Sequence, residues 1–207
     1  MVSSVRNLKR LIYLISPRKI YLNFYKDLEK VLSSKRVSFF QLRLKTTPKN
    51  LIIKIAKKIK IITKKNKVKF IINDDSKLAK KIGSDGCHIG QLDNTVVSAR
   101  RDVKKKIIGV TCHNSKELAL KASKDEADYV AFGSFFKSKL KPNAKKADLK
   151  ILFWAKKNIK KPIIVIGGIT DKNYKKLINA GANYIAISTF IWNNPFLKPE
   201  VAIKKFK

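Results

Sequence analysis

The sequence predicts a single (β/α)8 barrel of the TIM type, one domain over residues 1–207 with the barrel proper at about 10–206. Short apolar runs alternate with amphipathic, lysine-rich stretches, eight such pairs can be counted, and 207 residues suit one sizeable core. An open doubly wound sheet is the alternative. That fold usually carries a glycine-rich turn after its first strand, whereas Ser16-Pro17-Arg18-Lys19 follows the first run here, so the barrel is favoured.

The expected strands are short apolar runs, and several are bounded by glycine or by polar residues. They span residues 11–15, 39–44, 69–72, 86–89, 106–110, 129–132, 162–166 and 184–187.

The expected helices are recognised by apolar spacing and by their end residues. Over residues 48–65, Ile52, Ile55, Ile59 and Ile62 recur every three or four positions and make one apolar face. Ser115 is the expected N-cap of a helix that extends to residue 124. A helix over 173–179 should end near Gly181, and a last helix should span 199–206.

The charge is extreme, with 48 Lys and Arg against 14 Asp and Glu and a formal net charge of +34. A specific nucleic-acid binder usually gathers its basic residues into a patch with aromatic residues between them. Here the lysines are spread along the helices, and the longest basic run is 104–106. We therefore expect attraction of anions and salt-dependent, non-specific contact with nucleic acid, but no specific nucleic-acid partner.

Membrane insertion and secretion are not indicated. The apolar run nearest the start covers only residues 11–15, whereas a membrane span needs about 20 residues and a signal-peptide core about 7–15. Cys87 and Cys112 are the two cysteines, too few for a disulfide framework. A cytoplasmic location is expected. The oligomeric state is left open, and a homo-oligomer is compatible with the sequence.

In a barrel of this kind, function is found at the carboxyl ends of the strands. The second strand ends with Gln41, Arg43 and Lys45 on one face and leucines on the other. An amide, a guanidinium and an ammonium along one wall suit a phosphorylated ligand. The alternative is that two more cations occur by chance in a lysine-rich chain, and the alternation with leucine makes that alternative weaker.

Acidic residues are scarce, so those after the third and fourth strands stand out. Asn73, Asp74 and Asp75 follow the third strand, and Asp93 follows the fourth. Asp74 and Asp93, on neighbouring loops, could share one Mg²⁺, which prefers oxygen ligands and takes one or two carboxylates plus phosphate oxygens. Asp75 or Ser76 is expected to cap the next helix instead, with Asp74 facing the site.

Two Cys-His pairs, Cys87-His88 and Cys112-His113, raise the question of zinc. Neighbouring residues of a strand point to opposite faces, so each pair offers one ligand at most to a common site, and the known zinc spacings are absent. We expect the histidines to be packing or hydrogen-bonding groups near the mouth of the barrel.

A second anion pocket is expected at the seventh and eighth strands. Gly167 and Gly168 follow the seventh strand, and Ser188 and Thr189 follow the eighth, where barrels commonly bind phosphate. The loop after the sixth strand carries hydroxyl groups and lysines over residues 134–141 and could close over a phosphate.

The ordered motifs resemble those of the thiamine-phosphate synthase family from residue 11 onward. The stretch 41–45 is similar to its QxRxK element, 72–75 to its ND element, 85–93 to DGxHxGQxD, and 109–113 to GxSxH. Residues 127–133 and 166–170 are also similar, although related barrels share them widely.

The resemblance implies a transferase that couples 4-amino-5-hydroxymethyl-2-methylpyrimidine diphosphate with 4-methyl-5-(2-phosphoethyl)thiazole, giving thiamine phosphate and pyrophosphate. It implies Mg²⁺ as the cofactor and these two phosphorylated small molecules as the partners. Asp74 and Asp93 would bind the metal, and Arg43, Lys45 and Lys141 would stabilise the leaving pyrophosphate. Gln41, Arg43, Lys45, Asn73, Thr111 and Lys141 would hold the pyrimidine diphosphate, and Ser138, Gly168, Ser188 and Thr189 the thiazole phosphate.

Two other functions stay open. A sister branch of the same barrel, the thiazole tautomerase group, uses a histidine after the sixth strand, where this chain has Ser134. A non-catalytic binder of thiamine-pathway phosphates is suggested by Leu140, which replaces a hydroxyl of the family's TxTK loop.

Overall fold

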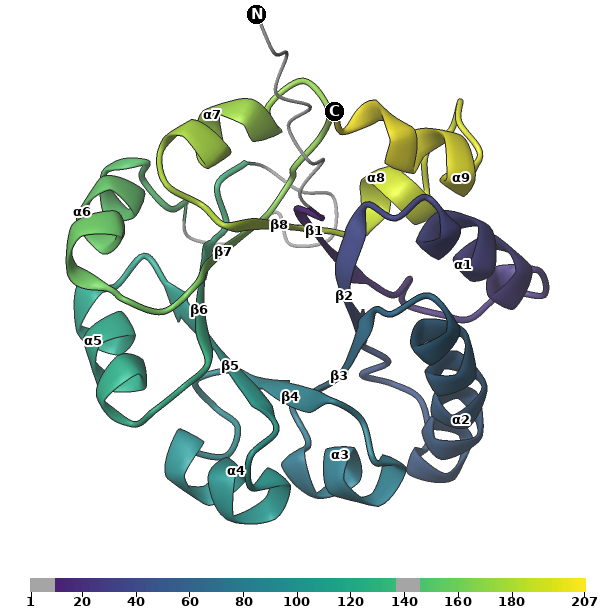
Figure 1. The fold of residues 1–207 in the computed structure, drawn as a ribbon, viewed down its shortest axis with the longest axis horizontal. Helices are drawn as coiled ribbons and strands as arrows, with labels where there is room; N and C mark the ends of the chain where they lie inside the picture. The colour runs from purple at the N-terminus through teal and green to yellow at the C-terminus, as the bar shows by residue number, and fades with distance from the viewer. Residues whose placement is uncertain (1–9, 137–145) are drawn as a thin grey trace, which may run out of the picture.

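The computed structural model describes residues 10–136 and 146–207, and these form a closed barrel of parallel strands surrounded by helices (Figure 1). The strands pair in chain order from β1 to β8, and β8 returns to pair with β1. The predicted (β/α)8 barrel is therefore confirmed.

The eight strands are short, and each begins within two residues of its predicted start. They are β1 (Ile12–Ile15), β2 (Val37–Leu42), β3 (Lys69–Asn73), β4 (Gly86–Ile89), β5 (Ile107–His113), β6 (Tyr129–Gly133), β7 (Ile163–Ile166) and β8 (Tyr184–Ile187).

A helix follows each strand, and further short helical segments follow β8. They are α1 (Phe24–Ser33), α2 (Lys49–Lys65), α3 (Ser76–Ile82), α4 (Val96–Val103), α5 (Lys116–Lys124), α6 (Lys150–Asn158), α7 (Tyr174–Asn179), α8 (Thr189–Trp192), α9 (Pro199–Ala202) and a 3₁₀ turn (Ile203–Lys205). The predicted cap of α5 is present, since the Ser115 hydroxyl accepts a hydrogen bond from the Leu118 amide.

Alternate residues of the strands point outward under the helices or inward to the barrel axis. The outward set joins the helices in one large core, in which Ile55 and Ile59 of α2 are buried and Ile52 and Ile62 are partly buried. The inward set forms a second cluster that fills the barrel. Its buried members are Tyr13, Ile15, Tyr129, Ala131, Ile164 and Ala186.

Two predicted elements end earlier in the structure than expected, for identifiable reasons. β2 ends at Leu42 rather than at residue 44, because the Arg43 amide donates to the Ser16 hydroxyl at 3.0 Å instead of to a neighbouring strand. The last helix does not reach residue 206. Phe206 leaves the helical conformation, and its buried ring packs against Tyr174 and Phe190.

β5 continues to His113, three residues beyond its predicted end, because it keeps pairing with β6 past Val110. A bulge between Thr111 and His113 accompanies this extension. Thr111 therefore lies inside the strand rather than in the loop after it.

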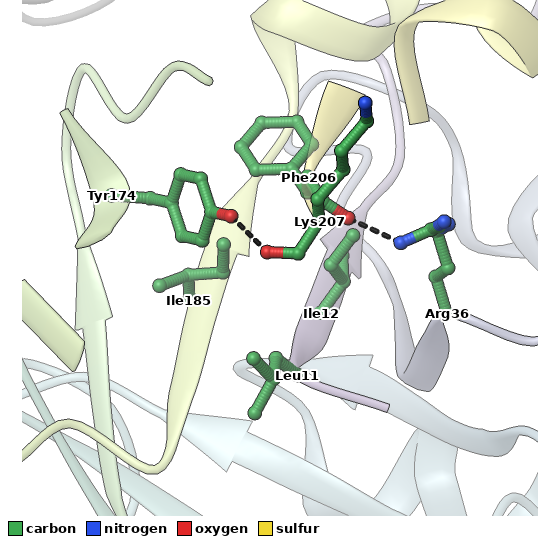
Figure 2. A pocket seen from close by; sticks show the side chains of 7 residues that line it. All are labelled: Leu11, Ile12, Arg36, Tyr174, Ile185, Phe206 and Lys207. Carbon is green, nitrogen blue, oxygen red and sulfur yellow. Dashed lines mark hydrogen bonds between the residues drawn. The ribbon is translucent and has the colours of Figure 1, made fainter. Parts of the chain in front are cut away.

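The C-terminal segment packs outside the ring of strands, near α7 and the beginnings of β1 and β8 (Figure 1). Figure 2 shows a small cavity of about 60 Å³ beside the beginnings of β1 and β8. The Tyr174 hydroxyl donates to the Lys207 carbonyl, and the Arg36 guanidinium donates to the Phe206 carbonyl. These contacts tie the end of the chain to α7 and to the residue before β2.

Within the described residues, no helix has both the length and the apolar character that a membrane crossing requires.

The Tyr129 ring on β6 approaches β5 so closely that position 109 has to be glycine. A Cβ atom added to Gly109 would lie 1.8 Å from Cζ of Tyr129, the neighbouring residue on β6. We predict that Gly109→Ala lowers the free energy of unfolding by about 1–3 kcal/mol through overpacking, measured by denaturant titration. In Tyr129→Leu the added methyl group meets a smaller side chain, so the double variant should lose less than the two single losses added together. Strictly additive losses would contradict the proposed clash.

Candidate active site

Polar side chains from β2 and β3 meet at the carboxyl end of the barrel. Gln41 is buried, and its side-chain amide donates to the Asn73 side-chain oxygen at 2.5 Å. Arg43 follows on the same side of the chain, half-buried, and burial lowers the pKa of its guanidinium, although arginine stays charged. Lys45 is more exposed and forms an ion pair of 3.3 Å with Asp74. The structure thus brings Gln41, Arg43, Lys45 and Asn73 to one wall, as predicted.

The two adjacent acids after β3 have different roles. Asp75 caps α3, because its carboxylate accepts a hydrogen bond of 2.8 Å from the Leu78 amide, and it pairs with Lys49 at 2.9 Å. Asp74 has φ = +64°, a left-handed conformation that aspartate tolerates better than most residues. This turn of the backbone directs Asp74 to Lys45 and away from the helix. The predicted division between the two residues is confirmed.

Asp93 lies in the loop after β4, next to Asp74. Its carboxylate accepts a hydrogen bond of 2.6 Å from the Gly90 amide, which fixes the loop as a tight turn. Partial burial and the hydrogen-bonded, like-charged Asp74 carboxylate raise the pKa of Asp93, against the lowering effect of the Gly90 amide. The two like-charged carboxylates repel each other, so a cation bound between them would be favoured.

The donor set at this position fits Mg²⁺ better than a softer metal. Asp74 and Asp93 offer hard oxygen ligands, and magnesium commonly takes one or two carboxylates and completes its shell with water and phosphate oxygens. Among the described residues there is no group of three or more His, Cys, Asp and Glu side chains that could hold a metal ion by themselves. A phosphorylated ligand would supply the remaining oxygens.

The two Cys-His pairs do not converge on a metal. Cys87 and Cys112 are buried, free thiols that point into the outer core, while His88 points into the barrel and His113 is exposed. His88 Nε2 lies 2.8 Å from the Thr111 hydroxyl, and its Nδ1 lies 2.9 Å from the Tyr129 hydroxyl. His88 is the hydrogen-bonding group that the sequence predicted.

Sequence patterns did not identify Tyr13 and Tyr129 as neighbours of this site. Their hydroxyl groups share a hydrogen bond of 2.8 Å across the barrel, although they are 116 residues apart. The available signal was their place in two expected strands, with glycine at position 109 leaving room for a ring. That signal indicates packing and gives no partner for either hydroxyl.

The loop that carries Asp93 has a support that was also not predicted. The buried Ser76 hydroxyl donates to the Asp102 carboxylate at 2.5 Å and accepts from the Asn94 side-chain amide at 3.2 Å. Asn94 follows Asp93 directly, so this contact joins the β4–α4 loop to the start of α3.

A second set of residues lies after β7 and β8. Gly167 and Gly168 have φ values of +108° and +58°, and a Cβ atom on Gly167 would lie 1.9 Å from the Ser134 hydroxyl oxygen. Ser188 and Thr189 begin the short helix α8, whose first amides lack acceptors within the helix. The Ser188 hydroxyl itself donates to the Ser16 carbonyl at 3.0 Å. Backbone amides, rather than that hydroxyl, are therefore the free donors for an anion.

Ser138, Leu140 and Lys141 lie outside the described residues. Their predicted contacts with the thiazole phosphate and with the pyrimidine diphosphate stay predictions. Ser134, just before this segment, has its hydroxyl engaged with the Phe136 carbonyl at 3.0 Å.

Comparison with known proteins gives consistent results. Residues 12–191 match the model of a family described as thiamine monophosphate synthase. The chain is 56% identical to a thiamine-phosphate synthase of Pelagibacter ubique over 96% of this chain and 97% of that protein, and 39% identical to one of Erythrobacter litoralis over 88% of each. A solved thiamine phosphate pyrophosphorylase of Pyrococcus furiosus superposes with a TM-score of 0.85 at 24% identity, covering 96% of this chain and 95% of that one.

Burial of His88 predicts a specific acid sensitivity. Desolvation lowers the pKa of His88 from 6.5 to about 4, so the unfolded chain takes up a proton below about pH 6.5 while the native state does not. Stability from this group is therefore complete above pH 6.5 and falls by up to about 3 kcal/mol as the pH drops to 4. Urea titrations at several pH values should give a smaller acid loss for His88→Gln than for the parent protein. His113→Asn, which alters the exposed histidine, is the control and should keep the full slope. Equal slopes in all three proteins would contradict the assignment.

Proposed function

The chain belongs to the thiamine monophosphate synthase family, and from that premise we propose that it is a Mg²⁺-dependent transferase that makes thiamine phosphate. The substrates would be 4-amino-5-hydroxymethyl-2-methylpyrimidine diphosphate and 4-methyl-5-(2-phosphoethyl)thiazole, and the products thiamine phosphate and pyrophosphate. The observation that carries the proposal is the meeting of the Asp74–Asp93 pair with Arg43 and Lys45 at the carboxyl end of one barrel.

The β2–β4 wall would hold the pyrimidine diphosphate. Gln41 and Asn73 already fix each other through their side-chain amides, which leaves their remaining polar atoms for a heterocycle. Arg43 and Lys45 offer a planar fork and a point charge to the diphosphate, and Arg18 lies close enough to Arg43 to add to the positive potential. Thr111, and Lys141 from the segment outside the described residues, would complete this part of the site.

Asp74 and Asp93 would hold the metal. When bound, Mg²⁺ supplies positive charge that offsets the charge of the diphosphate. The Gly90 amide holds the Asp93 carboxylate, and Lys45 holds that of Asp74, so both ligands are oriented before any metal arrives.

The β7–β8 pocket would receive the thiazole phosphate. Gly168 and the first amides of α8, at Ser188 and Thr189, supply backbone donors at the place where barrels of this type commonly bind phosphate. Ser138 would add a hydroxyl from the loop after β6.

The reaction asks the protein for positioning and charge rather than for acid–base catalysis. The bond between the pyrimidine methylene carbon and a diphosphate oxygen breaks, and its electron pair leaves with pyrophosphate. The thiazole nitrogen then gives its lone pair to the resulting pyrimidine cation, and no proton has to move. Arg43, Lys45 and Lys141 would stabilise the leaving group, and the two pockets would hold the rings in line. A site without a catalytic dyad suits this chemistry.

The tautomerase alternative receives less support. It requires an acid–base histidine after β6. This chain has Ser134 at that position, and the Ser134 hydroxyl donates a hydrogen bond to the Phe136 carbonyl. His88, the histidine inside the barrel, has both ring nitrogens within hydrogen-bond distance of protein hydroxyls.

We also propose a cytoplasmic location. Two free, buried thiols suit a reducing compartment. The net charge of +34 would favour the approach of anionic substrates without specific nucleic-acid recognition.

Removal of either metal ligand should abolish metal-dependent synthesis. With both substrates and Mg²⁺, we expect the parent protein to form thiamine phosphate and pyrophosphate, and Asp74→Ala and Asp93→Ala to lose at least about a hundredfold in kcat/KM. Coupled detection of pyrophosphate with chromatography of thiamine phosphate measures both products.

The matched control is Asp75→Asn, one position further along the same loop. Asparagine keeps the cap of α3, so this variant should retain activity within a few-fold. If the parent protein binds the thiazole phosphate but forms no product, the synthase proposal fails and the non-catalytic binder replaces it.

A further inference from the structure

A chain of hydrogen bonds crosses the interior of the barrel beneath the proposed pyrimidine pocket. It runs from the Tyr13 hydroxyl on β1 to the Tyr129 hydroxyl on β6 at 2.8 Å, then to His88 Nδ1 on β4 at 2.9 Å. His88 Nε2 continues the chain to the Thr111 hydroxyl on β5 at 2.8 Å. The His88 and Tyr129 rings are stacked, with an interplanar angle of 19°, so the links are held by packing as well as by hydrogen bonds.

The chain of hydrogen bonds ends inside the protein at Tyr13. Tyr13 is 1% exposed, and its ring stacks on Phe39 in the apolar interior of the barrel. Among the described residues, Tyr129 is the one hydrogen-bond partner of the Tyr13 hydroxyl. The Tyr13 proton must therefore be donated to Tyr129, because the opposite arrangement would leave an O–H group unpaired in an apolar environment.

This constraint sets the direction of every later link. The Tyr129 oxygen accepts from Tyr13, so its own proton goes to His88 Nδ1, which must then be unprotonated. A neutral imidazole carries its single proton on the other nitrogen. Nε2 therefore donates to the Thr111 oxygen, and the Thr111 proton is left without a protein acceptor in the described structure.

Thr111 is the open end of the chain. It is half-buried on the inner face of β5, next to Ala131 of β6, while its backbone carbonyl accepts from the Gln91 side chain. Its oxygen accepts from His88 Nε2, and its own proton is thus free to be donated towards the mouth.

We propose that Tyr129, whose oxygen accepts from Tyr13, is a positioning residue that fixes the His88 tautomer and thereby presents the Thr111 hydroxyl as a hydrogen-bond donor to an acceptor atom of the bound pyrimidine diphosphate. This inference rests on the proposed function for the identity of the ligand. The direction of the chain rests on the barrel interior alone.

The tautomer of His88 tests the direction without any substrate. His88 and His113 are the two histidines of the chain, so His113→Asn leaves one ring to observe, and asparagine tolerates the φ of +51° at that position. Two-bond ¹H–¹⁵N correlation spectra of ¹⁵N-labelled protein should show a single tautomer protonated on Nε2. In Tyr129→Phe, which removes the donor to Nδ1, a mixture of the two tautomers is expected. A parent spectrum with the proton on Nδ1 would overturn the proposal.

Steady-state kinetics test the effect on the substrate. We expect Thr111→Val to raise the KM for the pyrimidine diphosphate about tenfold, the usual effect of one lost hydrogen bond, and Thr111→Ser to restore it. Tyr129→Phe should raise the same KM about two- to fivefold, less than Thr111→Val because the donor is misdirected rather than removed. The KM for the thiazole phosphate should not change in these variants.

Tyr184→Phe is the matched control for Tyr129→Phe, since the Tyr129 ring packs on Phe39. Tyr184 also packs on Phe39, at the amino end of the barrel, but takes no part in the hydrogen-bond chain. It should leave both the His88 tautomer and the KM values unchanged. If Tyr129→Phe changes stability but neither the tautomer nor the KM, Tyr129 is only structural and the proposal is wrong.

The direction of the hydrogen-bond chain and the proposed function can be overturned independently of each other. An active synthase whose His88 carries its proton on Nδ1 would overturn the directed chain and leave the proposed function intact. An Nε2 tautomer in a protein that forms no thiamine phosphate would overturn the proposed function, and with it the assigned ligand of Thr111.

Discussion

Filling the interior of a closed eight-stranded barrel is the constraint on which the rest of this structure depends. Each strand sends alternate side chains to the axis, and the available width is fixed by closure of β8 onto β1. The large ring of Tyr129 fits because Gly109 lies opposite it on β5. At Gly109, a single added carbon would overlap the Tyr129 ring. Large and small inward residues therefore have to be chosen together, across strands that are far apart in the sequence.

The same packing places polar groups in the barrel interior, which would otherwise be apolar. Tyr129 and His88 are stacked within the barrel, and burial keeps the phenol protonated and the imidazole neutral at ordinary pH. Their polar atoms are tolerated because each has a partner inside the protein. The apolar floor and the polar mouth of the site are thus parts of one interior, joined through His88.

Charge is arranged differently at the mouth than over the rest of the chain. The helices carry lysines that are mostly exposed, whereas Arg43 and Lys45 are placed beside Asp74 by the ends of two neighbouring strands. Asp74 reaches that place through a left-handed backbone conformation, and Asp75 uses the next position to start α3. Placing two of the 14 acidic residues together needs a compensating positive charge, which Lys45 supplies in part and the proposed metal would complete.

Sequence patterns alone were enough to predict the barrel fold, the two faces of its strands and the different roles of Asp74 and Asp75. These depend on local periodicity and on capping, which involve residues close together in the chain. The sequence could not determine that β2 ends at Leu42, because the Ser16 hydroxyl that accepts from the Arg43 amide lies just after another strand, β1. Nor could it show that Tyr13, Tyr129, His88 and Thr111 form one chain. Those contacts join residues up to 116 positions apart, and only closure of the barrel decides which inward side chains meet.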